Sequence, residues 1–306
     1  MDTVILENIS KSYITHTTPA LNDVSFSVGK GELFGLIGPD GAGKSTIFRI
    51  LTTLLLPDSG KATVAGYDVV KDYHEIRSCV GYMPGKFSLY QDLTIEENLR
   101  FFATLFGTTV AENYALIKDI YEQIAPFKDR RAGKLSGGMK QKLALCCALV
   151  HRPEVLFLDE PTTGVDAVSR QEFWEMLRRL KAQGITIVVS TPYMDEASLC
   201  ERIALIQTGT ILSIDTPDNI IRAYPGKLYS LRAPKVYLLL HDVRLYEGID
   251  QCYAAGETLR VSFKDERKDH PALLRAYLQH KGHPQVSVDQ ITPDIEDCFI
   301  EKLSDQ

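Results

Sequence analysis

Long hydrophobic runs are missing from this sequence. The best apolar stretches, around Val155–Leu158 and Ile185–Val189, have the length of a buried strand, whereas a membrane-spanning helix needs about 20 apolar residues. The amino terminus, MDTVILENISKSY, lacks a basic stretch followed by a long apolar core, so we expect no secretory signal. Any membrane role is therefore predicted to be peripheral.

Blocks of charge of one sign are absent as well. Forty acidic and 34 basic residues give a net charge of −6 and are spread along the chain. This distribution argues against a general nucleic-acid coat, and we expect no nucleic-acid partner. The six cysteines form no CxxC pair, and Cys146 and Cys147 fall in an apolar helical stretch. We interpret them as core residues of a protein in a reducing cytosol.

What is present is a regular alternation of strand-like and helix-like segments. The 306 residues are enough for two domains, because a domain takes about 150 residues. Before residue 220 the alternation is typical of an α/β fold. Ala223-Tyr224-Pro225-Gly226 interrupts it, and we predict one domain over residues 1–222 and a second over residues 226–306.

The periodicity places individual elements. In the first domain we expect strands over residues 21–28, 33–38, 155–158, 186–190, 203–207 and 211–214, and helices over residues 44–54, 94–106, 110–124, 136–150 and 166–182. The second of these helices opens on the capping box Thr94-Ile95-Glu96-Glu97. Residues 86–152 are predicted to form a helical subdomain inserted in the sheet.

The remaining residues predict a small α+β domain with a split βαβ arrangement. Its expected order is a strand over 228–232, a helix over 235–241, strands near 243–246 and 259–263, a helix over 271–280, a strand over 286–290 and a helix over 293–303.

A phosphate-binding loop lies between the expected strand 33–38 and helix 44–54. Gly38-Pro39-Asp40-Gly41-Ala42-Gly43-Lys44-Ser45 fits the pattern G-x-x-x-x-G-K-[ST]. Its glycines let backbone amides curl around phosphates, and the following helix adds its partial positive end. Lys44 is expected to reach the β and γ phosphates, and the Ser45 hydroxyl is a ligand for Mg²⁺.

Two carboxylates end a buried strand more than 100 residues later. In Val155-Leu156-Phe157-Leu158-Asp159-Glu160, Asp159 is placed to hold Mg²⁺ through water and Glu160 to polarise an attacking water as a general base. A third motif, Leu135-Ser136-Gly137-Gly138-Met139, offers bare amides and a hydroxyl at a helix start, which is either a second anion site or an ordinary helix cap.

Through these motifs the sequence resembles the ATP-binding subunit of an ABC transporter, in the branch that partners an ABC-2 type export permease. The resemblance covers residues 3–220 and includes the loop Gly164-Val165-Asp166; the ending Ile295–Ile300 resembles the small extra domain of drug-exporter members. It implies a P-loop NTPase core of the ABC ATPase type with a helical subdomain and a C-terminal α+β domain. It also implies ATP and Mg²⁺ as cofactors.

The resemblance implies a site shared by two subunits that pack head to tail. Ser136, Gly137 and Gly138 of one subunit would face the γ-phosphate held by Lys44 of the other. The nucleotide site would also include Thr46 and Asp166, and Tyr13 lies where the family places an aromatic that stacks on adenine. The alternative for a lone tyrosine is a core position.

Two positions depart from the family pattern. Gly81-Tyr82-Met83-Pro84-Gly85 has a glycine where the family has a glutamine, and Pro192 follows Ser190-Thr191 where the family has a histidine. Neither residue has a polar side chain to replace them, so the binding residues are complete while the hydrolysis residues are partly missing. Lys86, Gln91, Thr191 and Tyr193 are candidate substitutes.

We therefore predict an ATPase subunit that couples ATP hydrolysis to export by a separate ABC-2 type permease. It would be cytoplasmic, peripheral on the inner face of the cell membrane, and a homodimer or a heterodimer with another ABC ATPase. One alternative is a non-transport ABC protein of ribosomes or DNA repair, but those carry two cassettes or a long coiled coil. Another is a regulatory subunit that clamps ATP and barely hydrolyses it. Selectivity would lie in the permease, so the chain does not reveal the transported substrate.

Overall fold

The computed structural model describes residues 2–14, 18–265 and 269–304. The chain divides into two compact units, Met1–Ile220 and Ile221–Gln306. The helix α7 (Pro217–Arg222) spans the division.

A six-stranded sheet forms the centre of the first unit. Its order is β10-β9-β3-β8-β7-β6; the five strands from β9 to β6 are parallel to one another, and β10 is antiparallel to β9. The strands are β3 (Leu33–Ile37), β6 (Val80–Met83), β7 (Val155–Asp159), β8 (Thr186–Thr191), β9 (Arg202–Gln207) and β10 (Thr210–Asp215). β3, β7 and β8 are buried at every residue and are mainly apolar, as parallel central strands are, with polar residues at the ends of β7 and β8. Their carboxyl ends meet at one edge of the sheet.

A second, antiparallel sheet has the order β2-β1-β4-β5. Its strands are β1 (Asp2–Lys11), β2 (Leu21–Gly29), β4 (Ser59–Val64) and β5 (Tyr67–Asp68). One hydrophobic core joins both sheets to α1 (Lys44–Leu51). Phe48 of α1 packs on Phe157 of β7 with ring centroids 5.7 Å apart, which fixes the helix over the sheet. The short helix α2 (Tyr73–Cys79) leads into β6.

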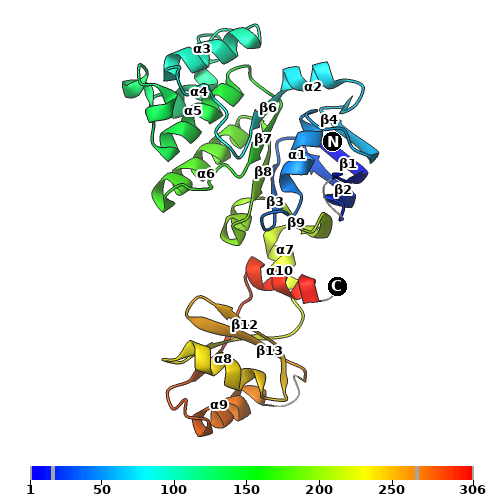
Figure 1. The fold of residues 1–306 in the computed structure, drawn as a ribbon, viewed down its shortest axis with the longest axis vertical. Coiled ribbons are helices and arrows are strands. Elements are labelled where there is room, and N and C mark those ends of the chain that lie inside the picture. Colours follow the sequence, from blue (N-terminus) through cyan, green and yellow to red (C-terminus); the bar gives the residue numbers. More distant parts are fainter. Residues whose placement is uncertain (1, 15–17, 266–268, 305–306) are drawn as a thin grey trace. The chain divides into compact units, whose positions relative to one another are not determined.

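The chain between β6 and β7 is helical. It contains α3 (Ile95–Leu105), α4 (Tyr114–Tyr121) and α5 (Gly137–Leu149), and 3-10 turns at Ala125–Phe127 and Ala132–Lys134. Thr94 and Glu97 form the predicted capping box at the start of α3. These helices gather on one side of the sheet, away from α1 (Figure 1). The long helix α6 (Ala167–Ala182) follows β7, and a 3-10 helix (Met194–Leu199) follows β8.

The second unit has the split βαβ arrangement. Its elements run β11 (Leu228–Arg232), α8 (Val236–Arg244), β12 (Ile249–Ala255), β13 (Thr258–Phe263), α9 (His270–His280), β14 (Ser287–Ile291) and α10 (Ile295–Ser304). The sheet order is β12-β13-β11-β14, and all pairs are antiparallel. Two crossovers therefore pass helices over one face, and Leu239, Val243, Leu274 and Leu278 of α8 and α9 belong to the core of this unit.

The α/β class of the first unit and the α+β class of the second are as predicted, but several elements differ. The strand expected near 243–246 is wrong, because α8 continues to Arg244 and buries Val243 one turn after Leu239. The helix expected over 110–124 is limited to α4, and β1, β4 and β6 were not anticipated. Among the described residues, no helix combines the length and apolar character needed to cross a bilayer.

Candidate functional site

The phosphate-binding loop connects β3 to α1 at the carboxyl edge of the sheet. Gly41 and Gly43 have φ values of 79° and 106°, and a Cβ atom at Gly43 would lie 2.6 Å from the carbonyl oxygen of Ala20. Only glycine fits there. Gly43 is also the N-cap of α1, and no side chain caps this helix end. The first amides of α1 are therefore available to an anion.

The Lys44 side chain lies inside this loop. Its Nζ atom donates to the carbonyl oxygens of Gly38 at 2.7 Å and Pro39 at 3.0 Å, and it lies 3.1 Å from Oε1 of Glu160. The lysine side chain is 3% exposed and the glutamate side chain 22%. The structure thus joins the predicted phosphate ligand and the predicted general base in one ion pair.

Ser190, near the end of β8, holds both acidic residues of the neighbouring strand. Its hydroxyl donates to Oδ1 of Asp159 at 2.7 Å. The backbone amide of Glu160 is directed at the Ser190 hydroxyl, 3.0 Å away, and at the Ser190 carbonyl oxygen, 3.1 Å away. Glu160 has a left-handed backbone, with φ of 50°. A non-glycine residue in this region is strained, and such strain is concentrated at functional sites.

Thr191 makes a second set of contacts that the sequence analysis missed. The Gly38 amide donates to its carbonyl oxygen at 3.2 Å, and its hydroxyl donates to the buried carboxylate of Glu196 at 2.5 Å. Thr162, which follows Glu160 by two residues, donates to the other oxygen of Glu196 at 2.8 Å. These contacts of Ser190 and Thr191 could have been expected from their position at the end of a strand, β8, that lies between β3 and β7.

Tyr13 lies beside the same helix start. Its hydroxyl is 3.3 Å from that of Thr46, in the first turn of α1, and its side chain is half-buried. The structure therefore places Tyr13 next to the phosphate-binding loop, where an aromatic face can meet a base.

The remaining predicted residues form a separate cluster. Ser136 is the N-cap of α5, and its hydroxyl accepts from the Met139 amide at 3.4 Å. Asp166 is the N-cap of α6 and accepts from the Ser169 amide at 3.0 Å, a bond that lowers the pKa of the Asp166 carboxyl. A Cβ atom at Gly138 would lie 3.1 Å from the Ser169 hydroxyl, so the two helix starts adjoin. In the part of the chain that the structure describes, no hydrogen bond or ion pair links Ser136 or Asp166 to the phosphate-binding loop.

Similarity to known proteins agrees with this geometry. Residues 21–163 match the family model described as ABC transporter. The Nod factor export ATP-binding protein I of Bradyrhizobium diazoefficiens is 41% identical over 292 residues, covering 92% of this chain and 90% of the relative. The chain belongs to the ABC transporter ATP-binding proteins.

Two further similarities set the extent of the match. The probable multidrug ABC transporter ATP-binding protein YbhF of Escherichia coli is 38% identical over 306 residues, covering 98% of this chain. The chain spans about half (52%) of that relative's length. A dimeric ATP-binding cassette in a post-hydrolysis state, bound to ADP and Pi, has a TM-score of 0.63 and 26% identity, covering 70% of this chain and 98% of the cassette.

The two departures from the ABC pattern have distinct surroundings. A Cβ atom at Gly85 would lie 3.2 Å from the carbonyl oxygen of Asp159. Gly85 is therefore next to the residue whose carboxylate is the expected Mg²⁺ ligand. Pro192 lies between Thr191, whose hydroxyl is committed to Glu196, and Tyr193, whose ring lies 4.3 Å from the Arg170 guanidinium. Of the candidate substitutes, Thr191 is therefore engaged elsewhere, and Gln91 lies beside Gly133 in the helical part.

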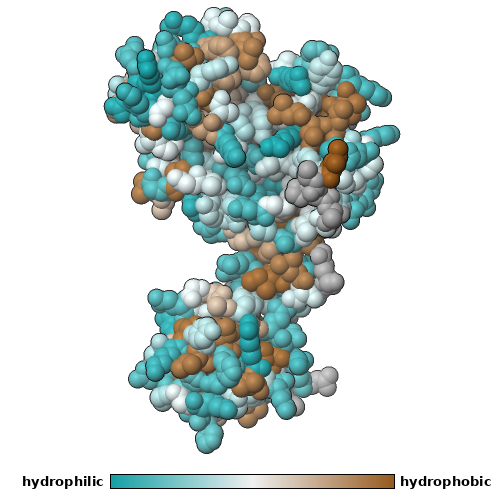
Figure 2. All heavy atoms as spheres, in the orientation of Figure 1, coloured by the Kyte–Doolittle hydropathy of each residue, from teal (hydrophilic) through white to brown (hydrophobic). Residues whose placement is uncertain are grey.

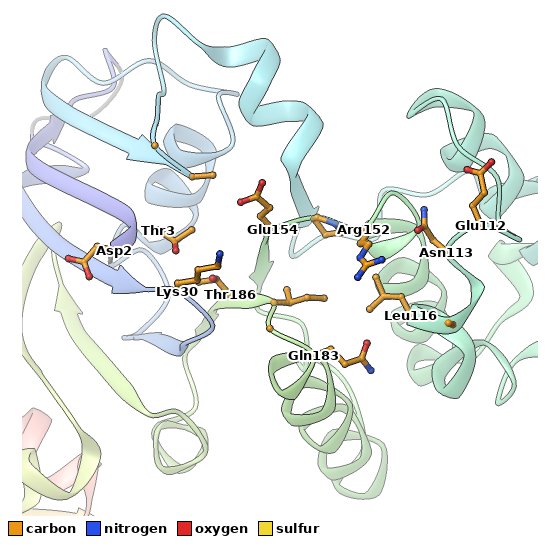
Figure 3. Close-up of a pocket in the computed structure, with 16 residues that line it drawn as sticks. Asp2, Thr3, Lys30, Glu112, Asn113, Leu116, Arg152, Glu154, Gln183 and Thr186 are labelled. Carbon is orange, nitrogen blue, oxygen red and sulfur yellow. The ribbon is translucent and has the colours of Figure 1, made fainter.

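A cavity of about 770 Å³ lies at the opposite edge of the central sheet (Figure 3). Lys30, Glu154 and Thr186, which line it, precede or begin β3, β7 and β8, and Asn113 and Leu116 face them from the helical part. This cavity is therefore separate from the ABC nucleotide site.

Proposed function

We propose that this chain is the ATP-hydrolysing subunit of an exporter and that a separate ABC-2 type permease carries the substrate. The convergence of Lys44, Asp159 and Glu160 at the carboxyl edge of the sheet is the observation that carries this proposal. The names of the relatives, a multidrug transporter component and a Nod factor exporter component, support export. The subunit would then be peripheral on the cytoplasmic face of the membrane.

The residues present fit ATP and Mg²⁺. The uncapped start of α1 and the loop Gly38–Ser45, extended by Thr46, would bind the phosphates, and Tyr13 would stack on adenine. Ser45 and Asp159 would hold Mg²⁺, which neutralises charge on the phosphates when bound. Asp159 is buried, and its one bonded oxygen, Oδ1, accepts from Ser190, so a second oxygen is available to the metal's water.

Binding and hydrolysis are linked through the Lys44–Glu160 ion pair. Phosphate oxygens compete with Glu160 for the lysine, because several charged phosphate oxygens can accept charge-assisted bonds where Glu160 offers a single contact at 3.1 Å. Release of Glu160 leaves a carboxylate that can accept a proton from water. Its backbone is already fixed by Ser190, so little reorganisation is needed.

The cluster of Ser136, Gly137, Gly138 and Asp166 supports a shared site. Ser136, Gly137 and Asp166 are exposed and Gly138 is partly exposed, so the cluster is accessible to a second subunit. We infer that this cluster closes over the nucleotide of a second ATP-binding subunit, either the same chain or a related one. Residues 1–222 would form the ATPase domain, with the helical subdomain over 86–152, and residues 226–306 an accessory domain.

Exposed apolar side chains mark a surface for the permease. Figure 2 shows hydrophobic residues gathered between α2 and β4 and over part of α3. Leu54 and Leu56 are each 59% exposed, and Leu105 of α3 is 64% exposed. Apolar groups gathered on one face commonly mark a binding surface for another protein.

Glu160→Gln tests the proposal, because it keeps the shape of the side chain and removes the base. The variant should bind Mg-ATP, fail to hydrolyse it and elute as a dimer in size exclusion, whereas Glu172→Gln, which changes an exposed glutamate of α6, should behave as the unmodified protein. Co-purification with a membrane protein encoded beside it would support export. Hydrolysis by Glu160→Gln at the unmodified rate would exclude Glu160 as the base.

A further inference from the structure

The carboxylate of Glu196 joins two segments that follow different strands. Oε1 accepts from the Thr162 hydroxyl at 2.8 Å and Oε2 from the Thr191 hydroxyl at 2.5 Å. Glu196 is 1% exposed, and both threonines are fully buried. Buried polar groups with complete partners of this kind select one arrangement, because leaving a hydroxyl or carboxylate unpaired is costly.

Each threonine is attached to a group of the nucleotide site. Thr162 follows Glu160 by two residues, and the Thr163 amide donates back to the Glu160 carbonyl oxygen at 3.2 Å in a tight turn. Thr191 accepts from the Gly38 amide and follows Ser190, whose hydroxyl contacts Asp159. A displacement of Glu196 would therefore shift the base on one side and the start of the phosphate-binding loop on the other.

A partly exposed cation, 27% of whose side chain is accessible, balances the charge of Glu196. The Nε atom of Arg170, on α6, lies 3.7 Å from Oε1 of Glu196, and its Nη1 atom lies 3.7 Å from Asp195. The guanidinium also lies 4.3 Å from the centre of the Tyr193 ring. Arg170 therefore contacts the residues on both sides of the 193–196 turn and holds it against α6.

We propose that Glu196 is a positioning residue for ATP hydrolysis, which holds the end of β8 and the segment after Glu160 in a single arrangement. The inference rests on the proposed role of Glu160 as the base. Pro192 has no polar side chain to fix this segment on a nucleotide, and the bonds of Glu196 fix it from inside the protein instead.

Isosteric variants remove the two hydroxyls bonded to Glu196 one at a time. Thr162→Val and Thr191→Val each delete one hydroxyl bonded to Glu196, and Thr186→Val is the matched control. Thr186 is 1% exposed and lies at the other end of β8, where its hydroxyl accepts from the Gly31 amide at 2.9 Å. Thr162→Val and Thr186→Val each lose one hydrogen bond, and Thr191→Val also loses the bond that the Tyr193 amide donates to its hydroxyl at 3.1 Å. All three should therefore melt at lower temperature.

Only the two variants at Glu196 should affect turnover. We expect kcat to fall about 10- to 100-fold, as for a small misplacement of a catalytic group, with KM for ATP changed by less than about threefold. The double variant should be no slower than the slower single one, because both remove the same link. Thr186→Val should keep the unmodified kcat. A measurable rate in the unmodified protein with unchanged kcat in both single variants would overturn the proposal.

Amide hydrogen exchange provides a readout that does not need hydrolysis. Thr162→Val should speed exchange in residues 191–196, and Thr191→Val should speed it in residues 160–165. In each case the effect appears in the segment that Glu196 connects to the altered residue. Increases confined to the altered segment would overturn the inference. If the unmodified protein hydrolyses no ATP, the proposed function fails, and this exchange pattern alone decides the role of Glu196.

Discussion

Lys44 and Glu160 form an ion pair across the carboxyl edge of the sheet, with Nζ and Oε1 3.1 Å apart. Without nucleotide, the lysine that we expect to bind phosphate is thus paired with the glutamate that we expect to act as the base. Under the proposed function, ATP would replace one partner of the lysine, so the step that binds the phosphates would also free the carboxylate. Occupancy and readiness for hydrolysis are thereby linked by a single contact.

Lys44→Ala should weaken ATP binding by about an order of magnitude or more, because the variant lacks a cation at the β and γ phosphates. Isothermal titration with Mg-ATP measures the change. Lys142→Ala is the matched control, since Lys142 pairs with Glu172 at 2.7 Å away from the loop. An affinity for Lys44→Ala equal to that of the control would remove Lys44 from the site.

Tyr13→Ala should weaken ATP binding about fivefold, whereas Tyr13→Phe should bind as the unmodified protein does, because an aromatic stack is worth about 1 kcal/mol and does not need the hydroxyl. Titrations of the same variants with GTP show whether the loss of affinity is specific to adenine. If Tyr13→Phe loses as much affinity as Tyr13→Ala, the hydroxyl contact with Thr46 and not the ring is what matters.

The isolated protein should hydrolyse ATP slowly, because Gly85 and Pro192 provide no polar contact to the transition state. Each such contact is typically worth about 10²- to 10³-fold in rate. Pro192→His should therefore raise basal kcat about tenfold or more, because its imidazole would supply a polar contact to the nucleotide. Steady-state phosphate release measures this. A fast unmodified protein that is inactivated by Lys86→Ala or Tyr193→Phe would instead identify a substitute already in place.

Gly85→Gln tests the other departure. The new Cβ atom would lie 3.2 Å from the Asp159 carbonyl oxygen, so a small shift of the segment accompanies any substitution. Gly85→Ala isolates that steric effect. We expect Gly85→Gln to change stimulation by the permease more than basal rate, relative to Gly85→Ala. Equal behaviour of the two variants in the reconstituted complex would contradict this.

Asp166 should make stability depend on pH below about pH 4. The Ser169 amide lowers the pKa of the Asp166 carboxyl in the folded protein. A lowered pKa means that the stabilisation is present above the unfolded value, near 3.9, and is lost as the pH falls through the folded value. Asp166→Asn keeps a good N-cap without titrating. Urea midpoints of the two proteins should converge from pH 5 to pH 3; a constant difference would exclude this effect.

Local signals allowed much of the fold to be predicted. The limits of β7 and the capping box of α3 follow from an unbroken apolar run and from a four-residue motif. The strand expected at 243–246 is wrong although Val243 and Tyr246 favour a strand, because burial of Leu239 and Val243 on one face of α8 outweighs local propensity.

The nucleotide-site motifs were visible in the sequence because each is contiguous. The role of Glu196 was not visible in the sequence, because a glutamate in the short polar segment MDEASL is expected to be exposed to solvent. Its burial depends on Thr162, 34 residues earlier, and on Arg170 from α6. Only the folded chain brings these groups together.

The left-handed backbone of Glu160 sets a limit on how stable this protein can be with its chemistry intact. A glutamate at φ of 50° carries conformational strain of about 1 to 3 kcal/mol, which glycine at the same place would relieve. Glu160→Gly would relieve this strain, but it would also leave Lys44, which is 3% exposed, without its carboxylate partner, so the variant should hydrolyse no ATP and should not melt at a higher temperature. The unfavourable backbone of Glu160 and its ion pair with Lys44 therefore belong together, and a stabilised form intended for use must keep both.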